Sequence, residues 1–129
     1  MELEMQTQHE LSTFCPAYHR AVELIGRRWT GAILRALLAD VKRFNDLAAG
    51  VPGLSDRMLA ERLRELEAEG LVVRLVIPDI PVRVEYSLTE KGLALESVVH
   101  AVAHWAETWA GVQPCRHGTV EETAALRRA

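Results

Sequence analysis

Residues 52–74 of the chain read PGLSDRMLAERLRELEAEGLVVR. A proline and a glycine make a turn, and the hydroxyl of Ser55 can then cap a helix that begins beside it. Leucines recur at i, i+4 and i+7 on one face of that helix, at Leu59, Leu63 and Leu66. Gly70 can end the helix, since a glycine adopts the left-handed conformation without steric cost. The β-branched run that follows predicts a strand.

The opposite face of this predicted helix is charged and carries Arg57, Glu61 and Arg64. A short amphipathic helix with exposed arginines, followed directly by a strand, is typical of a helix that enters the major groove of DNA and is followed by a wing. The pattern also fits an ordinary surface helix whose charges are only solvated. The flanking sequence has to distinguish between the two.

Three helices are predicted before this one, at about residues 16–26, 29–38 and 44–49. Pro16 suits the first turn of the first helix, and Trp29, Ile33 and Leu37 form an apolar stripe on the second. Residues 50–53 form a turn between the third helix and the helix capped by Ser55. Two short helices joined by a glycine-containing turn, the second with a basic outer face, are the helix-turn-helix pattern, which favours DNA binding.

A hairpin is predicted next, with strands at residues 71–77 and 83–88. The first strand is almost wholly apolar, and the second alternates polar and apolar residues as a half-buried strand does. Two prolines between them require a loop. Arg74 and Arg83 are the basic residues of this wing, and an arginine near a hairpin tip can reach a phosphate or the minor groove. The alternative is that they only keep the hairpin soluble.

A long helix is predicted from a cap at Thr89 to about residue 110. Its apolar residues form one stripe, and because aromatic residues are enriched at protein interfaces, we expect this stripe to form a homodimer interface. The expected interface residues are Leu95, Val98, Val99, Val102, Trp105 and Trp109. The alternative is that the helix folds back wholly onto its own domain. Together the elements predict an α+β, mainly α fold, a winged helix-turn-helix with a two-stranded wing and terminal dimerisation helices.

The 129-residue chain is 49% hydrophobic and 26% charged, as in an ordinary soluble domain. No apolar run approaches the roughly 18 residues that span a membrane, and the N-terminus has no signal-peptide pattern, so we expect a cytoplasmic protein with no membrane partner. We predict one domain at residues 15–111 between flexible tails at 1–14 and 112–129, the second with a capping pattern at residues 119–122. The net charge of −3 means that DNA binding has to rest on locally placed arginines.

Several short motifs, none of them specific alone, together resemble the HxlR-type winged-helix transcription regulators, relatives of the MarR type. The matching segments are Cys15-Pro16, residues 25–30 (IGRRWT), Ile33-Leu34-Arg35, Arg43-Phe44, residues 52–55 (PGLS), Arg57-Met58-Leu59, Arg62-Leu63, Glu65-Leu66, residues 70–72 (GLV), Pro81, residues 84–89 (VEYSLT) and Gly92. The resemblance covers about residues 15–109. It implies a prokaryotic homodimer that binds a pseudo-palindromic DNA operator. We expect the protein to act there as a repressor, with activation as the alternative. The chain departs from the family pattern at Gly31, Asp40-Val41 and Ile77, outside the recognition helix.

At the DNA, the residues expected nearest the bases are Ser55, Arg57 and Met58, at the start of the recognition helix. Arg57 is expected to contact a guanine, and Met58 a thymine methyl group. Glu61 would either accept a hydrogen bond from a cytosine or orient Arg57 one turn away. The residues expected at the phosphate backbone are Arg43, Arg62, Arg64 and Arg83, with Arg74 as the other basic residue of the wing.

The two cysteines, Cys15 and Cys115, have no zinc-binding spacing. In several proteins of the resembled family a cysteine at the Cys15 position senses oxidants or electrophiles, and Cys15 also precedes a predicted helix N-terminus, whose dipole favours negative charge. We therefore hold redox sensing through Cys15, and an intersubunit disulfide with Cys115, beside the alternative of a structural cysteine.

No other chemistry is predicted. His100 and His104 have a spacing that can chelate a metal, but no third ligand has a defined spacing, so we predict solvated histidines, no metal and no cofactor. Because the sequence has no glycine-rich phosphate loop, GxSxG or HExxH pattern, we predict no enzyme. The alternative to a DNA-binding regulator is an adaptor that binds another protein through its winged helix.

Overall fold

The structure is a computed structural model that describes residues 13–111. Its elements are α2 (Pro16–Ile25), α3 (Thr30–Leu38), α4 (Phe44–Gly50), α5 (Asp56–Ala68), β1 (Val72–Ile77), β2 (Arg83–Leu88), α6 (Glu90–Leu93) and α7 (Glu96–Trp109). The tails predicted at residues 1–14 and 112–129 lie almost wholly outside the described residues, and so do Cys115 and the capping pattern at residues 119–122.

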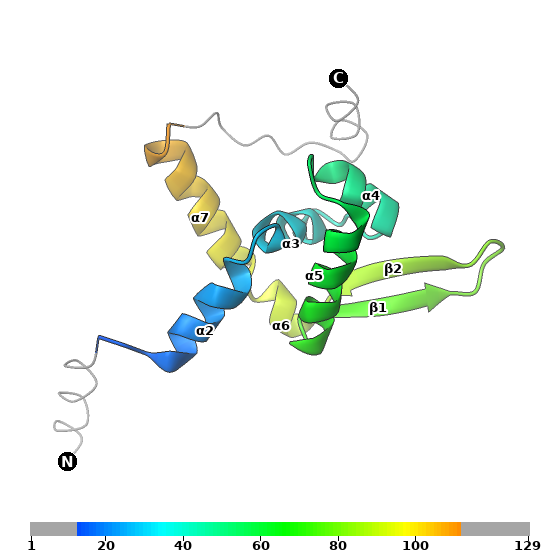
Figure 1. Ribbon diagram of the computed structural model, residues 1–129, viewed down its shortest axis with the longest axis horizontal. Coiled ribbons are helices and arrows are strands. Elements are labelled where there is room, and N and C mark those ends of the chain that lie inside the picture. The colour runs from blue at the N-terminus through cyan, green and yellow to red at the C-terminus, as the bar shows by residue number, and fades with distance from the viewer. Residues whose placement is uncertain (1–12, 112–129) are drawn as a thin grey trace, which may run out of the picture.

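The helices α3, α4 and α5 lie beside a two-stranded antiparallel hairpin that projects from them as a wing (Figure 1). In the hairpin Val72 pairs with Leu88 and Ile77 with Arg83. The backbone N–H of Tyr86 also donates to the carbonyl of Lys42, at 2.8 Å, which ties the base of the wing to the segment before α4. The predicted α+β, mainly α winged helix-turn-helix with a two-stranded wing is confirmed.

The core lies where α3, α4, α5 and the base of the wing meet. The predicted apolar face of α5 is buried, with Leu59, Leu63 and Leu66 each no more than 1% exposed. They pack with buried residues of the neighbouring elements, namely Ile33, Leu34, Leu37, Leu47, Ala48, Val51, Leu54, Leu71, Val72 and Tyr86. Burial of apolar surface stabilises a fold by about 25 cal/mol per Å². The packing of these leucines against the core therefore determines which face of α5 points to solvent.

The prediction of a single helix from Thr89 to about residue 110 is wrong, because the structure has two helices there, α6 and α7. Short-range polar contacts hold α6 against the end of α5. Thr89 accepts from the N–H of Gly92 and donates to the carbonyl of Gly70, and Lys91 donates to the carbonyl of Glu69. The chain then turns near Leu95, so that α7 leaves the core in a new direction.

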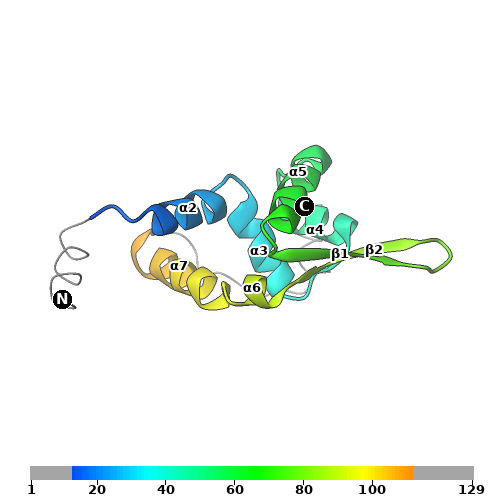
Figure 2. The same ribbon diagram turned by 90° about the horizontal axis from the view of Figure 1, so that it is seen from below.

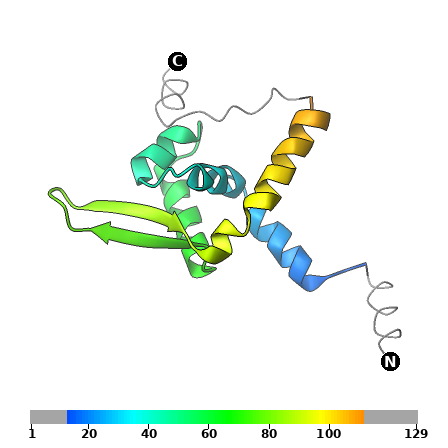
Figure 3. The same cartoon turned by 180° about the vertical axis from the view of Figure 1, so that it is seen from behind.

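The helices α2 and α7 project from the core on the side away from the wing, as Figures 2 and 3 show from below and from behind. Neither helix has a buried residue. Along residues 13–111, no helix is both long and apolar enough to cross a membrane.

Candidate nucleic-acid interface

The turn before α5 fixes where that helix begins. The N–H of Leu54 donates to the carbonyl of Val51 at 3.2 Å, and Ser55 caps the helix by accepting from the N–H of Met58 at 3.1 Å. Gly53 has a φ of +88°, and a Cβ at this position would lie 3.2 Å from the ring of Trp29. The turn therefore requires a glycine here, and the predicted Ser55 cap is confirmed.

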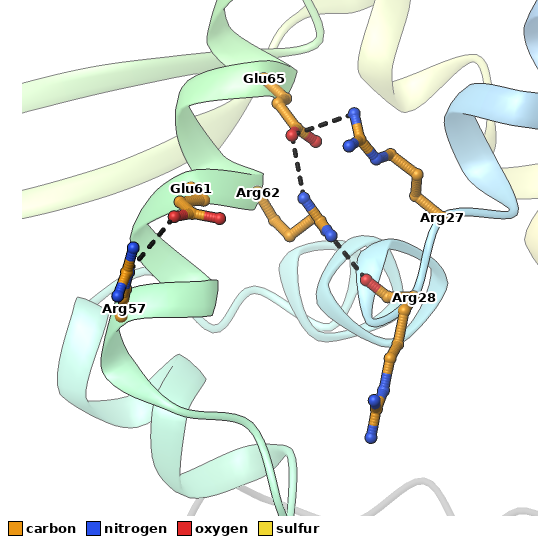
Figure 4. A network of polar contacts seen from close by, with 6 residues as sticks. All are labelled: Arg27, Arg28, Arg57, Glu61, Arg62 and Glu65. Carbon is orange, nitrogen blue, oxygen red and sulfur yellow. Dashed lines mark hydrogen bonds and ion pairs between the residues drawn. The ribbon is translucent and has the colours of Figure 1, made fainter.

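The outer face of α5 presents Arg57 to solvent, with 90% of its side chain exposed. Its Nε lies 3.5 Å from Oε1 of Glu61, one turn further along (Figure 4). Of the two roles considered for Glu61, this geometry favours orientation of Arg57 over contact with a cytosine. Arg64 is also exposed on this helix. The outer face therefore offers two guanidinium groups to a polyanion.

Arg62 was expected at the phosphate backbone, but its side chain is buried and paired within the protein, which argues against that role. Only 8% of the residue is exposed. Its Nε donates to the carbonyl of Arg28 at 3.0 Å, and its NH1 donates to Glu65 at 2.9 Å. The sequence held a signal for this burial, since Arg62 follows Leu59 by three residues and precedes Leu66 by four, which places it within the apolar stripe. Its partner at residue 28 could not be read from local sequence.

Ser55 and Met58 are less free than Arg57. The Ser55 oxygen already accepts the capping hydrogen bond, which leaves its hydroxyl proton as the group that can face a base. Met58 is half-buried and packs against the core. The expected contact of Met58 with a thymine methyl group therefore depends on the exposed part of its side chain.

The basic residues around α5 differ in how exposed they are and in whether they form ion pairs. Arg43 is exposed at the N-cap of α4, beside Lys42, and Arg74 is exposed on β1. Arg83 is partly buried and pairs with Asp79 at 3.2 Å, so its charge is partly neutralised. Lys42, absent from the predicted contacts, lies 3.6 Å from Asp40 with its side chain 45% exposed, and its place next to Arg43 was the signal for it.

The match to known proteins decides the family. The model of HxlR-like helix-turn-helix proteins matches residues 24–114. The chain belongs to the HxlR-like helix-turn-helix family. The uncharacterised HTH-type transcriptional regulator YvaP of Bacillus subtilis is 47% identical over 98 residues, which are 76% of this chain and 91% of YvaP.

Solved structures of similar proteins agree with this assignment. The reduced form of the transcriptional regulator YodB of B. subtilis has a TM-score of 0.68 and 42% identity, covering 77% of this chain and 97% of the YodB chain. The oxidised form of the redox regulator HypR has a TM-score of 0.69 and 40% identity, covering 76% of this chain and 100% of that chain. The predicted HxlR-type resemblance is confirmed, and so is transcription regulation through DNA binding, a non-enzymatic function.

The residues predicted for the dimer interface of this HxlR-like chain fall into two groups. Leu95 and Val99 pack partly against the core of their own chain. The others are exposed, and α2 and the residue before its cap add further exposed apolar side chains. The exposed set is Phe14, Tyr18, Val22, Val98, Val102, Trp105 and Trp109. The chain thus carries an apolar surface on α2 and α7 that its own fold leaves uncovered.

Cys15 is a free, exposed cysteine at the N-cap of α2. Two exposed aromatic residues, Phe14 and Tyr18, lie close to it in sequence, and the ring of Phe14 contacts that of His19 with 5.3 Å between centroids. Cys15 is therefore accessible to a small reagent and lies on the same helix as part of the uncovered apolar surface. The predicted pairing with Cys115 stays a prediction.

Proposed function

We propose that this HxlR-like protein is a cytoplasmic repressor that binds a pseudo-palindromic DNA operator as a homodimer. The observation that carries the proposal is the outer face of α5, where Arg57 projects into solvent from a helix that three leucines fix to the core. An exposed arginine held in this way can form a bidentate contact with a guanine in the major groove. The two-fold symmetry of a dimer would then match that of the operator.

The contacts around Arg57 divide into base-reading and positioning groups. Ser55 and Arg57 are proposed to face base edges, with Glu61 orienting Arg57 and Met58 contributing its exposed part. Backbone contacts are proposed for exposed basic residues, which add affinity without sequence information. These are Arg43, Arg64 and Arg74, with Arg83 contributing a weaker contact because it is paired with Asp79.

The dimer is proposed to form through the uncovered apolar surface of α2 and α7. Large exposed apolar patches on a small domain mark sites of protein association, and tryptophans are enriched among the residues that dominate such interfaces. Trp105 and Trp109 are 61% and 75% exposed in the single chain. In this proposed dimer the two α5 helices enter successive turns of the major groove.

Binding is tested by gel shift with the DNA that flanks the protein's own gene, against a scrambled duplex of the same composition. Arg57→Ala is expected to lose roughly 1–3 kcal/mol of binding free energy on the specific duplex and much less on the scrambled one. Arg20→Ala, which removes the same charge from α2, is expected to leave both unchanged. Equal losses on both duplexes for Arg57→Ala would rule out its base-reading role. Binding that is insensitive to salt would point to a protein-binding adaptor instead.

The second part of the proposal is that oxidants or electrophiles change operator binding through Cys15. Its support is the exposure of this thiol beside the proposed dimer surface, together with the similar regulator YodB, which has been solved in reduced, diamide-treated and quinone-bound forms. Diamide or a quinone should change operator affinity in the wild type and not in Cys15→Ser. An unchanged wild-type affinity, with Cys15 shown to have reacted, would remove this part alone.

A further inference from the structure

Arg62 is the single charged residue that the described part of the chain buries. Figure 4 shows it on the side of α5 opposite Arg57, directed towards the connection between α2 and α3 at residues 26–29. Its two hydrogen bonds go in different directions, one to the carbonyl of Arg28 and one to Glu65 on its own helix. Because a buried charge that loses a partner is strongly destabilising, these bonds limit how far α5 can move relative to residue 28.

Glu65 connects the same turn of α5 to the same connection a second time. Its Oε1 lies 2.9 Å from NH1 of Arg62 and 3.1 Å from NH1 of Arg27. One carboxylate oxygen is thus shared by an arginine of α5 and an arginine of the connection. The backbone carbonyl of Arg28 and the side chain of Arg27 therefore both bind the same turn of α5.

Trp29 extends these contacts to the turn before α5. Its backbone lies in the left-handed region at φ +77°, which is uncommon for a bulky residue and persists only where surrounding contacts enforce it. Its ring lies against Gly53, two residues before the cap of α5, and the guanidinium of Arg28 lies 5.0 Å from its ring centroid. The connection therefore contacts both the start and the middle of the recognition helix. We call these contacts the clamp, formed by Arg27, Arg28 and Trp29 with Gly53, Arg62 and Glu65.

Beside the clamp, α2 and the C-terminal half of α5 border an open groove of about 530 Å³, which the clamp residues Arg27 and Glu65 also line. Arg20, Glu23 and Leu24 line it from α2, and Ala68 and Glu69 line it from α5. Charged side chains at a solvated groove do not fix a helix as close packing does. Leu24 and Ile25 of α2 are only partly buried against the core, so the direct polar contacts between α5 and the segment that follows α2 come from the clamp.

We infer that the clamp sets the position of the recognition helix relative to α2, and thereby the half-site spacing that the dimer accepts, with Arg62 as its positioning residue. The inference rests on the proposed dimer, in which α2 forms part of the subunit contact. Each added base pair moves a half-site by about 3.4 Å along the axis and rotates it. A recognition helix that is held firmly will reject a wrong spacing, whereas one that can shift will tolerate it.

The test measures spacing preference with duplexes that the wild-type protein selects from a randomised pool. Each selected duplex is remade with one base pair inserted or deleted between the half-sites. Wild type is expected to lose on the order of tenfold in affinity on these variants. Arg62→Met, which keeps the bulk of the side chain but removes both hydrogen bonds, is expected to lose at most about threefold. Arg62→Lys, which keeps the charge, should fall between them.

Two further variants separate positioning from general weakening. Arg64→Met removes a neighbouring exposed arginine and should lower affinity equally for every spacing. Arg27→Ala removes the half-exposed member of the clamp and is expected to fold even where Arg62→Met does not, with a smaller broadening of the spacing preference. The inference is overturned if Arg62→Met folds and keeps the wild-type spacing preference. If Arg62→Met does not fold, an unchanged spacing preference in Arg27→Ala overturns it instead.

A second measurement needs no DNA. Spin labels on Ala17→Cys and Ala68→Cys, in a background with both native cysteines changed to serine, report the distance between α2 and α5 when labelled chains are diluted into unlabelled ones. The distance distribution should be narrow in the parent and broader with Arg27→Ala or Arg62→Met. If wild type selects no DNA sequence, the proposed function fails, and this measurement alone decides the clamp. An unchanged distribution overturns it.

Discussion

Helices α5 and α7 both carry an apolar stripe at helical spacing, but they cover it differently. In α5 the stripe of Leu59, Leu63 and Leu66 is at most 1% exposed. In α7 the stripe ends in Trp105 and Trp109, which are well over half exposed, and the helix buries no residue. Apolar periodicity shows that a face needs cover, but it does not say whether the same chain or another provides it.

The polar faces of the two helices differ as well. The outer face of α5 is charged and includes a guanidinium oriented by a carboxylate, as suits a helix that meets a polyanion. The polar face of α7 carries His100 and His104, both exposed. Helix α5 thus packs its apolar face on the core of its own chain and exposes its charged face, whereas α7 exposes much of its apolar face. This difference supports the proposal that α5 contacts DNA and that α7 contacts a second subunit.

The largest effect is expected where α5 is buried. Leu63→Ala should lower the free energy of unfolding by roughly 2–5 kcal/mol, since it removes a fully buried side chain and leaves a cavity. Arg64→Ala, the adjacent exposed position, should change it by about 0.5 kcal/mol or less. Urea unfolding at one fixed protein concentration measures both. Similar losses at the two positions would show that α5 is not fixed by its leucines.

A different kind of loss is expected on α7. Trp105→Ala should weaken dimer formation by about 2 kcal/mol or more, because exposed tryptophans are frequent interface hot spots. Sedimentation equilibrium over a range of concentrations measures the shift towards monomer. His104→Ala, next to it on the solvated face, is the matched control and should leave the dimer unchanged. A Trp105→Ala protein that dimerises like wild type would place the subunit contact elsewhere.

Much of this contrast could be predicted from the sequence. The Ser55 cap, the leucine face of α5 and both strands were predicted to within a residue or two, since each depends on residues close together in the chain. The bend before α7 could not be predicted, because it depends on Thr89 and Lys91 reaching the end of α5.

The burial of Arg62 shows the same limit at the candidate site. A charge on an amphipathic helix is usually solvated, and the sequence-based assignment of Arg62 to the phosphate backbone followed that rule. The structure places its partner, the carbonyl of Arg28, 34 residues earlier in the chain. Local spacing could show that Arg62 lies within the apolar stripe, but only the tertiary fold supplies the acceptor that makes its burial tolerable.

Two adjacent valines sharpen the comparison within α7 itself. Val99 packs partly on its own core, whereas Val98 is exposed. Val99→Ala should lower the free energy of unfolding by about 1 kcal/mol, since it removes roughly two partly buried methylene equivalents. Val98→Ala should instead weaken the dimer by a smaller amount. Urea unfolding and sedimentation equilibrium are measured on both variants. We expect Val99→Ala to affect mainly unfolding and Val98→Ala mainly dimer formation. If both variants lose equally in both assays, α7 is not divided into a core-facing and a partner-facing side.

The smallest effect on stability is expected on the outer face of α5, where Glu61→Gln removes an exposed i,i+4 ion pair. The free energy of unfolding should fall by only about 0.3–0.5 kcal/mol. DNA binding should respond differently, because the variant removes a negative charge from the proposed DNA-contacting face and also releases Arg57, 3.5 Å away. Affinity for scrambled duplex should rise by about twofold, while the preference for the specific duplex over the scrambled one narrows. If the preference for the specific duplex is unchanged, Arg57 contacts its base without being oriented by Glu61. In that case Arg62, held by Arg28 and Glu65, is the one arginine of α5 whose orientation depends on contacts within the protein.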